Sequence, residues 1–284
     1  MSIPVHSKGA VKANDIDIYY ETFGNASDPS VLLIMGLGSQ CVHWFPYFYE
    51  PIVQKGYYVI RFDNRDLGLS SRVSSPYNLE DMAADTVGLL DALKIQQAHL
   101  IGISMGGMIA QRIAISYPKY ALSLTSIASS GYFGNRALQP TPTATFLERM
   151  ARYAQLDRAS EDYNLGLWRS LAGSVFPFDE KLHRQLYQQS FKDRKGFNPD
   201  ASQNQTQAMI ASGSRLGELS SITMPTLVIH GTEDPMIPES HALKYYPLIP
   251  GAKYLKMLGV GHEIPEGICS KIIPEFLTIL STKP

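Results

Sequence analysis

The hydrophobic pattern of the first half of the chain alternates between two kinds of segment. Short, nearly continuous apolar runs of strand length are separated by stretches whose apolar residues recur every three or four positions. The runs cover residues 31–35, 57–62, 98–103 and 123–128, and the helical stretches cover residues 44–54, 79–93 and 108–114. Strands and helices in alternation predict right-handed crossovers and an α/β fold, with a mostly parallel sheet covered by helices on both faces.

Three parts of the chain depart from this pattern. Residues 11–23 alternate loosely and predict a two-stranded hairpin over one edge of the sheet. From residue 132 to 216 the alternation stops, and helical spacing remains at residues 146–156 and 182–191. Strand-like runs resume at 226–231 and 252–258, before a last helix at 268–280 that Pro274 should kink or split. We therefore expect a core of residues 1–131 and 217–284, interrupted by a mainly helical insertion at 132–216.

Composition narrows the class of protein. The chain is 44% hydrophobic and 18% charged with a formal net charge of −1, and no basic cluster indicates a nucleic-acid or anionic membrane partner. Residues 1–13 lack the apolar segment of a secretory signal, and no stretch is long enough to span a bilayer. The two cysteines, Cys41 and Cys269, lie far apart and predict free thiols. We expect a cytoplasmic monomer or homodimer.

The strongest chemical motif lies where the strand at 98–103 meets the following helix. Residues 102–106 read Gly-Ile-Ser-Met-Gly, which matches G-x-S-x-G in the strand-turn-helix context that this motif requires. The glycines allow strand and helix to approach closely, and Ser104 then lies at a helix N-terminus that favours negative charge. The alternative is a glycine-rich turn that only connects two elements. The context favours Ser104 as a nucleophile.

A serine hydroxyl needs a base and a carboxylate that orients the base. In an open α/β sheet these groups belong on loops that follow the carboxyl ends of strands. Asp234 follows the run at 226–231 in a proline-flanked turn, and His262 follows the run at 252–258. The order Ser104, Asp234, His262 along the chain is the one expected when the nucleophile lies on a G-x-S-x-G turn between strand and helix, known as a nucleophile elbow.

These stretches, together with residues 31–38 and 61–70, resemble those of the α/β-hydrolase fold family, and most of all aclacinomycin methylesterase and similar small ester hydrolases. The resemblance covers residues 11–130 and 222–280 and is weak in the insertion. It implies a capped serine hydrolase in which Ser104 is the nucleophile, His262 the general base and then acid, and Asp234 the partner of the imidazole. It further implies an oxyanion hole formed by the backbone N–H groups of Leu37 and Met105, and it implies no cofactor or metal.

Two positions depart from the family pattern. Met35 stands where many relatives carry histidine, which leaves the geometry of the oxyanion hole less defined. Asp66 stands where relatives often have glycine, in a loop that we interpret as a structural turn supporting the oxyanion segment.

Other residues compete for each role. Glu233 precedes Asp234, but its side chain should point elsewhere around the turn. His230 ends an apolar strand and is expected to be a hydrogen-bonded core residue. The remaining histidines lack a matching context, either at the far end of the elbow strand or in unrelated segments: His99, His6, His183 and His241.

Residues of the substrate pocket are expected after the oxyanion segment and in the insertion. His43 follows the oxyanion segment and is expected to be a neutral packing residue, with contact to the substrate as the alternative; Trp44 and Phe133 are further candidates for substrate binding. Some aromatic and Met residues of the insertion should line an apolar pocket, and the rest should form its own core. We expect hydrolysis of a small-molecule carboxylic ester. Thioester, lactone or carbon–carbon bond hydrolysis and acyl transfer remain alternatives, as does a small-molecule receptor with little turnover.

Overall fold

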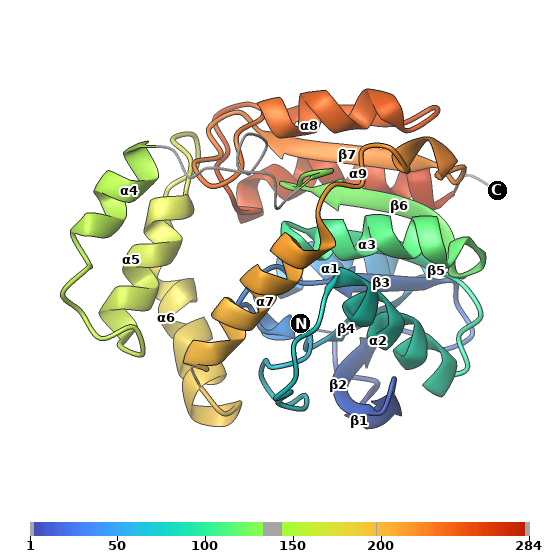
Figure 1. Ribbon diagram of the computed structural model, residues 1–284, viewed down its shortest axis with the longest axis horizontal. Helices are drawn as coiled ribbons and strands as arrows, with labels where there is room; N and C mark the ends of the chain where they lie inside the picture. Colours follow the sequence, from blue (N-terminus) through green and yellow to red (C-terminus); the bar gives the residue numbers. More distant parts are fainter. Residues whose placement is uncertain (1–2, 133–143, 197, 282–284) are drawn as a thin grey trace.

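The computed structural model describes residues 3–132, 144–196 and 198–281. Within these residues, eight strands form one sheet in the order β1-β2-β4-β3-β5-β6-β7-β8 (Figure 1). β2 pairs antiparallel with β1 and β4, and the other neighbouring strands are parallel. The bounds are β1 Ser7–Ala13, β2 Ile16–Phe23, β3 Ser30–Ile34, β4 Tyr58–Phe62, β5 Ala98–Ile103, β6 Ala121–Ile127, β7 Thr226–Gly231 and β8 Lys253–Met257. The predicted fold class is confirmed.

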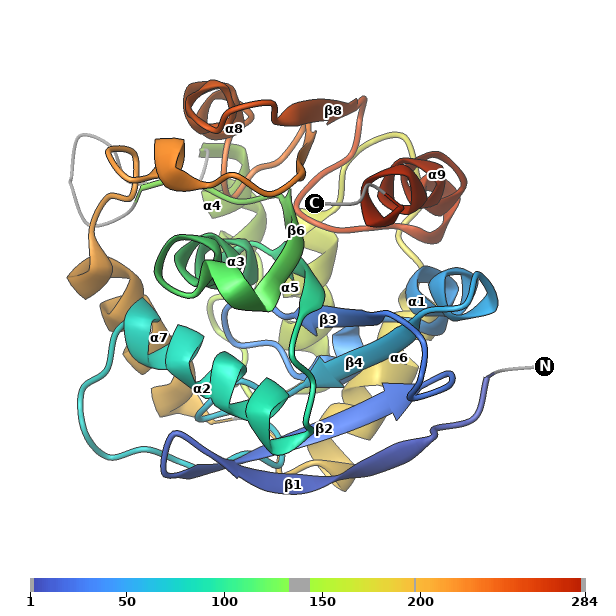
Figure 2. The ribbon, with the colours of Figure 1, turned by 90° about the vertical axis from the view of Figure 1, so that its right-hand side faces the viewer.

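The central strands are buried along their whole length because helices cover both faces of the sheet. In β3, Leu32 and Ile34 face one core and Val31 and Leu33 face the other. Figure 2 shows α2, α3 and α8 on the first face and α1 and α9 on the second. Their bounds are α1 Pro46–Gln54, α2 Leu79–Ala92, α3 Met105–Ser116, α8 Ser240–Tyr245 and α9 Cys269–Leu280. Side chains that alternate between two apolar cores explain why these strands are continuous apolar runs.

The last helix differs from its prediction. α9 runs without a break through Pro274, so the helix is not split there, and the alternative of a kink stays a prediction. Ile272 and Phe276, on either side of the proline, are fully buried in the core under this face of the sheet. Burial of the apolar face therefore outweighs the single backbone hydrogen bond that proline removes.

The segment between β6 and β7 contains four α-helices in its described part: α4 Ala144–Ala151, α5 Glu161–Leu171, α6 Glu180–Gln188 and α7 Pro199–Ser212. A π-helical turn, Gln189–Asp193, follows α6, and α4 ends before the residues up to 156 that we expected to be helical. α4, α5 and α6 lie beyond the end of the sheet toward which β6 and β7 point (Figure 1). At the base of the segment, the amide of Arg215 donates to the carbonyl of Gly131 at 2.9 Å. Among the described residues, no helix is both long and apolar enough to cross a bilayer.

Candidate active site

Ser104 occupies a sharp turn between β5 and α3. Its backbone has φ 57° and ψ −122°, a left-handed conformation that is strained for any residue with a side chain. Two hydrogen bonds hold the turn: the Ser104 amide donates to Ile127 O at 2.8 Å, and the Ser129 hydroxyl donates to Ser104 O at 2.7 Å. The Ser104 side chain makes no capping bond to α3. Its hydroxyl is therefore free to form a hydrogen bond with a side chain at the carboxyl ends of the strands.

The glycines of the motif are required by close backbone contacts. A Cβ atom on Gly102 would lie 2.2 Å from Gly106 O, and one on Gly106 would lie 2.1 Å from Ile34 O. Both distances are far below van der Waals contact, so no side chain fits at either position. The spacing of the motif thus follows from how tightly β5, α3 and the end of β3 pack around Ser104.

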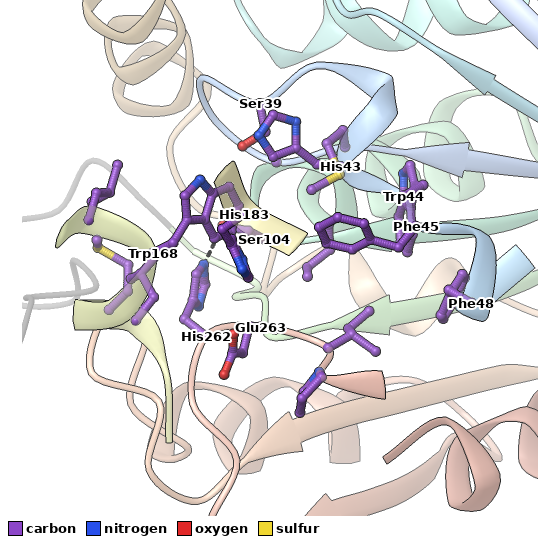
Figure 3. Close-up of a pocket in the computed structure, with 18 of the residues that line it drawn as sticks. Ser39, His43, Trp44, Phe45, Phe48, Ser104, Trp168, His183, His262 and Glu263 are labelled. Carbon is purple, nitrogen blue, oxygen red and sulfur yellow. Dashed lines mark hydrogen bonds between the residues drawn. The ribbon is translucent and has the colours of Figure 1, made fainter. Parts of the chain in front are cut away.

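Ser104, His262 and Asp234 form one hydrogen-bonded chain. Nε2 of His262 lies 3.0 Å from Oγ of Ser104, and Nδ1 of His262 lies 2.7 Å from Oδ2 of Asp234. The three side chains follow β5, β8 and β7, respectively, and Figure 3 shows the bond between Ser104 and His262. Because Nδ1 points at a carboxylate, it carries the proton, and Nε2 offers its lone pair to the hydroxyl.

Asp234 is held as an anion. Burial alone would raise its pKa, but the charge of His262 and hydrogen bonds from His230 and His262 hold the pKa well below its ordinary value. The amides of Met236 and Ile237 also donate to Oδ1, at 2.9 and 2.8 Å. Each carboxylate oxygen therefore accepts hydrogen bonds from within the protein.

The competing acid, Glu233, points away from this chain. Its carboxylate accepts hydrogen bonds from the amide and hydroxyl of Ser174, at 2.8 and 2.7 Å. The same stretch of the inserted segment also contacts the loop of residues 259–265 that carries His262, called the histidine loop below. The His262 amide donates to Leu171 O at 2.8 Å, and the Ser174 amide donates to Gly259 O at 2.9 Å. No motif in the sequence indicates that residues 171–174 hold both loops.

Of the two residues expected to supply oxyanion donors, Leu37 lines the same cavity as Ser104, and Met105 follows Ser104 in the chain. In the described part of the chain, the amide N–H groups of Leu37 and Met105 have no hydrogen-bond acceptor. Gly36 brings the first of them close, since a Cβ atom there would lie 3.1 Å from Cβ of Ser104. Met35, in place of the usual histidine, accepts a hydrogen bond on its carbonyl from Nδ2 of Asn64 at 3.0 Å.

The loop after β4 supports the oxyanion segment, residues 35–38, through the bond from Asn64 to Met35 O, and it also binds the backbone at residue 41. Oδ1 of Asp63 accepts from the Cys41 amide at 2.8 Å. Asp66 has φ 71°, a conformation that glycine adopts more easily, and its carboxylate accepts from the amide of Val73 at 2.7 Å and the hydroxyl of Tyr77 at 2.8 Å. These bonds explain how aspartate is accommodated where relatives often have glycine.

A cavity of about 780 Å³ opens over Ser104 and His262. Its walls come from the oxyanion segment and η1 (Cys41–His43), from α5 and α6 of the inserted segment, and from the histidine loop. Most of the lining side chains are apolar or aromatic: Met35, Leu37, Trp44, Phe45, Phe48, Met108, Leu167, Trp168, Leu171, Phe176, Phe178, Leu182, Met209, Met236 and Ile264. Its volume lies in the range of cavities that hold small molecules.

The expected pocket residues have different outcomes. His43 and Trp44 both line the cavity, although Trp44 is only 2% exposed. Phe133 lies outside the described residues. His183, which had no matching context in the sequence, also lines the cavity, because α6 turns this residue toward the core. His99 bonds to Ser123 Oγ at 2.8 Å and takes no part in the cavity.

Comparison with known proteins places this geometry in a family. Residues 29–266 match the sequence model of the alpha/beta hydrolase fold family. The chain belongs to the α/β-hydrolase fold family. The predicted family is thereby confirmed.

Two relatives and one solved structure are similar to this chain over stated lengths. The chain is 29% identical to rhodomycin D methylesterase DnrP of Streptomyces peucetius over 272 residues, which cover 89% of this chain and 91% of that protein. It is 38% identical to 3-oxoadipate enol-lactonase 2 of Acinetobacter baylyi over 117 residues, 40% and 42% of the two chains. The structure of the esterase EaEST from Exiguobacterium antarcticum superposes with a TM-score of 0.78 at 22% identity, over 97% of this chain and 100% of that one, which shows the shared fold.

Proposed function

We propose that this α/β-hydrolase cleaves a carboxylic ester of a small molecule through an acyl-enzyme intermediate on Ser104. The observation that carries the proposal is the hydrogen-bonded chain from Ser104 through His262 to Asp234, built from loops after three different strands. The names of the relatives, a methylesterase and an enol-lactonase, support an ester bond as the target.

In the first half of the reaction, Oγ of Ser104 attacks the ester carbonyl while Nε2 of His262 takes the hydroxyl proton. Asp234 keeps the ring in the correct tautomer and stabilises the imidazolium that forms. The carbonyl oxygen becomes an oxyanion, and the N–H groups of Leu37 and Met105 donate to it. Collapse of the tetrahedral intermediate breaks the bond to the alcohol, which leaves with the proton from His262, and the acyl group stays on Ser104.

Water completes the cycle. His262 takes a proton from a water molecule as its oxygen attacks the acyl carbonyl, and the same two N–H groups stabilise the second oxyanion. The bond to Oγ breaks, the proton returns to Ser104, and the carboxylic acid leaves. The chemistry balances as ester plus water giving acid plus alcohol.

We further propose that residues 132–216 act as a cap that forms one wall of the substrate pocket. Trp168, Leu182 and Thr206, from α5, α6 and α7, line the cavity over Ser104, which supports this role. His43 and Trp44 contribute to the wall on the core side. A cavity of about 780 Å³ suits a small molecule better than a polymer. The free, buried Cys41 and Cys269 support the cytoplasm as its location.

The direct test compares wild type with Ser104→Ala on short p-nitrophenyl esters and with a fluorophosphonate probe. We expect the variant to lose roughly 10⁴–10⁶ in kcat and all labelling. Ser221→Ala, at an exposed position, should behave as wild type. Undiminished turnover in Ser104→Ala would refute the mechanism, and tight ligand binding by a wild type that never labels would indicate a receptor.

Lactone hydrolysis is the second candidate, because the chain is 38% identical to the enol-lactonase over their matching stretch and 29% identical to the methylesterase. The same three side chains would open a cyclic ester, with the alcohol remaining attached to the acyl group. A panel of esters, thioesters and lactones of graded acyl length, with Ser104→Ala as the blank, separates the two. A lactone with the highest kcat/KM in the panel would favour this second function.

A further inference from the structure

Two imidazoles outside the proposed triad line the same cavity. His43 ends η1 on the core side, and His183 lies on α6 of the inserted segment. Both flank the indole of Trp168, with ring centroids 5.1 Å away for His43 and 5.5 Å away for His183. Figure 3 shows the three rings beside Ser104 and His262. Neither histidine has a part in the reaction described above.

Each ring is fixed by the start of its own helix. Nδ1 of His43 lies 2.9 Å from Gln40 O, and Nδ1 of His183 lies 2.8 Å from Asp179 O. The same two carbonyls accept the backbone amides of His43 and His183, at 3.0 and 3.1 Å. A carbonyl oxygen can only accept, so Nδ1 must carry the hydrogen in both rings.

The other nitrogen of each ring is therefore a bare acceptor. Burial lowers the pKa of His43 to about 3 and lowers that of His183 from its ordinary value, so both rings are neutral at neutral pH. In a neutral ring with the proton on Nδ1, Nε2 has only its lone pair. In the described part of the chain, neither Nε2 atom has a hydrogen-bond partner.

The surroundings of these acceptors are apolar. Phe178 stacks on His183 with centroids 4.4 Å apart, and Phe45 packs edge-on against it at 5.9 Å. When a substrate displaces water from this wall, an acceptor without a donor loses its hydrogen bonds. A substrate that brings donors avoids that loss, and one that brings only ether or methyl groups does not.

We propose that His43 and His183 form an accepting subsite that selects substrates with a hydroxyl or N–H group on the part held against Trp168. The predicted effect of this subsite on kcat/KM rests on the proposed ester hydrolysis. The predicted preference for binding ligands with a donor does not depend on that reaction. It adds a chemical class to the substrate: an ester whose acyl or alcohol part carries a hydrogen-bond donor.

The first experiment measures binding in Ser104→Ala, without turnover. The ¹⁵N-labelled imidazole nitrogens are followed by NMR between about pH 6 and pH 8, where an ordinary histidine would titrate. We expect both rings to remain neutral with hydrogen on Nδ1. Addition of para-propylphenol, whose single O–H donates to one nitrogen at a time, should shift the Nε2 resonance of at least one of the two rings, and para-propylanisole, which lacks the donor, should shift neither. A proton on Nε2, or no response to the phenol, would overturn the proposal.

The second experiment measures selectivity in the active protein. The substrates are p-nitrophenyl esters of para-hydroxyphenyl alkanoic acids, from acetate to hexanoate, each paired with its methoxy analogue. For the chain length that reaches the subsite, wild type should prefer the hydroxyl ester by about tenfold in kcat/KM. His43→Phe and His183→Phe should each reduce this preference, and His43→Gln and His183→Gln, which retain an acceptor, should restore part of it.

His6→Phe is the matched control, because His6 is exposed and lies outside the cavity. It should keep the wild-type preference. Equal rates for the hydroxyl and methoxy esters at every chain length would overturn the selectivity. If Ser104→Ala retained full turnover while the phenol still bound at His43 and His183, the proposed hydrolysis would fail and the subsite would stand.

Discussion

Nε2 of His230 lies 3.3 Å from Oδ2 of Asp234, the same oxygen that Nδ1 of His262 contacts at 2.7 Å. The His230 nitrogen also lies 2.7 Å from Ile237 O, and the Ile237 amide donates to Oδ1 of Asp234 at 2.8 Å. His230 is fully buried at the end of β7. Ring, carbonyl and carboxylate thus form a closed set of contacts that orients Asp234 toward His262.

Replacing His230 should therefore affect both folding and rate. In His230→Phe, the buried carbonyl of Ile237 loses its donor, which should lower the free energy of unfolding by about 1–3 kcal/mol. The loop from 234 to 237 would then hold Asp234 less firmly, and we expect kcat to fall about tenfold with little change in KM. His230→Gln, which retains a donor, should recover most of the loss. Urea unfolding and steady-state kinetics on a p-nitrophenyl ester measure the two effects.

His99→Phe separates the two contributions. His99 is also a buried imidazole on a strand, bonded to Ser123 Oγ, but it is remote from the cavity. It should lose stability and keep the wild-type kcat in the folded protein. If His230→Phe behaved in the same way, the ring would serve folding alone.

The choice between the two neighbouring acids gives a sharper prediction. Asp234→Asn should lower kcat by about 10⁴, because the amide can present a donor to Nδ1 and favour the wrong imidazole tautomer. Glu233→Gln keeps an acceptor for Ser174 and should stay within about threefold of wild type, since its carboxylate faces residue 174 and not the imidazole. Kinetics with one ester and both variants decide the assignment. A large loss in Glu233→Gln alone would transfer the role to Glu233.

Much of this site could be predicted because parallel strands end at one edge of the sheet. Ser104, Asp234 and His262 each follow an apolar run that is recognisable without the fold, and the structure brings them into hydrogen-bond contact. The aspartate at 66 was also correctly placed in a supporting turn, because its neighbours match the family pattern. In each case, a local signal was sufficient to locate the residue.

The inserted segment could not be predicted in the same way. Helical spacing shows that a helix forms but not which part of the core it covers, and His183 and Gln205 meet the core across long separations in sequence. The contacts of residues 171–174 with the histidine loop depend on the same packing. The persistence of α9 through Pro274 has the same cause, since burial against the sheet decides the outcome and no local rule includes it.

Gln205 joins the inserted segment to the oxyanion segment. Its side chain on α7 is fully buried, with Oε1 accepting from the Gly38 amide at 2.8 Å and Nε2 donating to Arg65 O at 3.1 Å. Gln205→Met preserves the size of the side chain and removes both bonds. We expect unfolding free energy to fall by about 1–3 kcal/mol and kcat to fall about tenfold, because Leu37 lies next to Gly38.

Gln207→Met is the control on the same helix, at an exposed position. It should match wild type in urea unfolding and in kcat. If Gln205→Met lost stability while kcat remained at the wild-type value, the oxyanion segment would not depend on this side chain. Loss of a complete oxyanion donor sets the upper limit, at about 10²–10³ in rate.

Glu263 gives the stability of the protein a specific pH dependence. Burial raises its pKa from 4.5 to about 7, so between these values the folded state binds more protons than the unfolded state. The free energy of unfolding should therefore fall as pH rises through this window, and the whole of that decrease should be present above about pH 7. Glu263→Gln removes the ionisation and should unfold at a higher temperature than wild type at pH 8, with the difference vanishing near pH 4.

The difference at pH 8 should be on the order of 1–2 kcal/mol, reduced by partial exposure of the carboxyl, which corresponds to a few degrees in Tm. Glu266→Gln, exposed at the start of the 3-10 helix Glu266–Ile268 that follows, is the matched control and should follow the wild-type pH profile. Thermal unfolding across the pH range measures all three proteins. Parallel profiles for wild type and Glu263→Gln would show that Glu263 ionises equally in both states, and a wild type that gains stability relative to the variant as pH rises would reverse the sign of the argument.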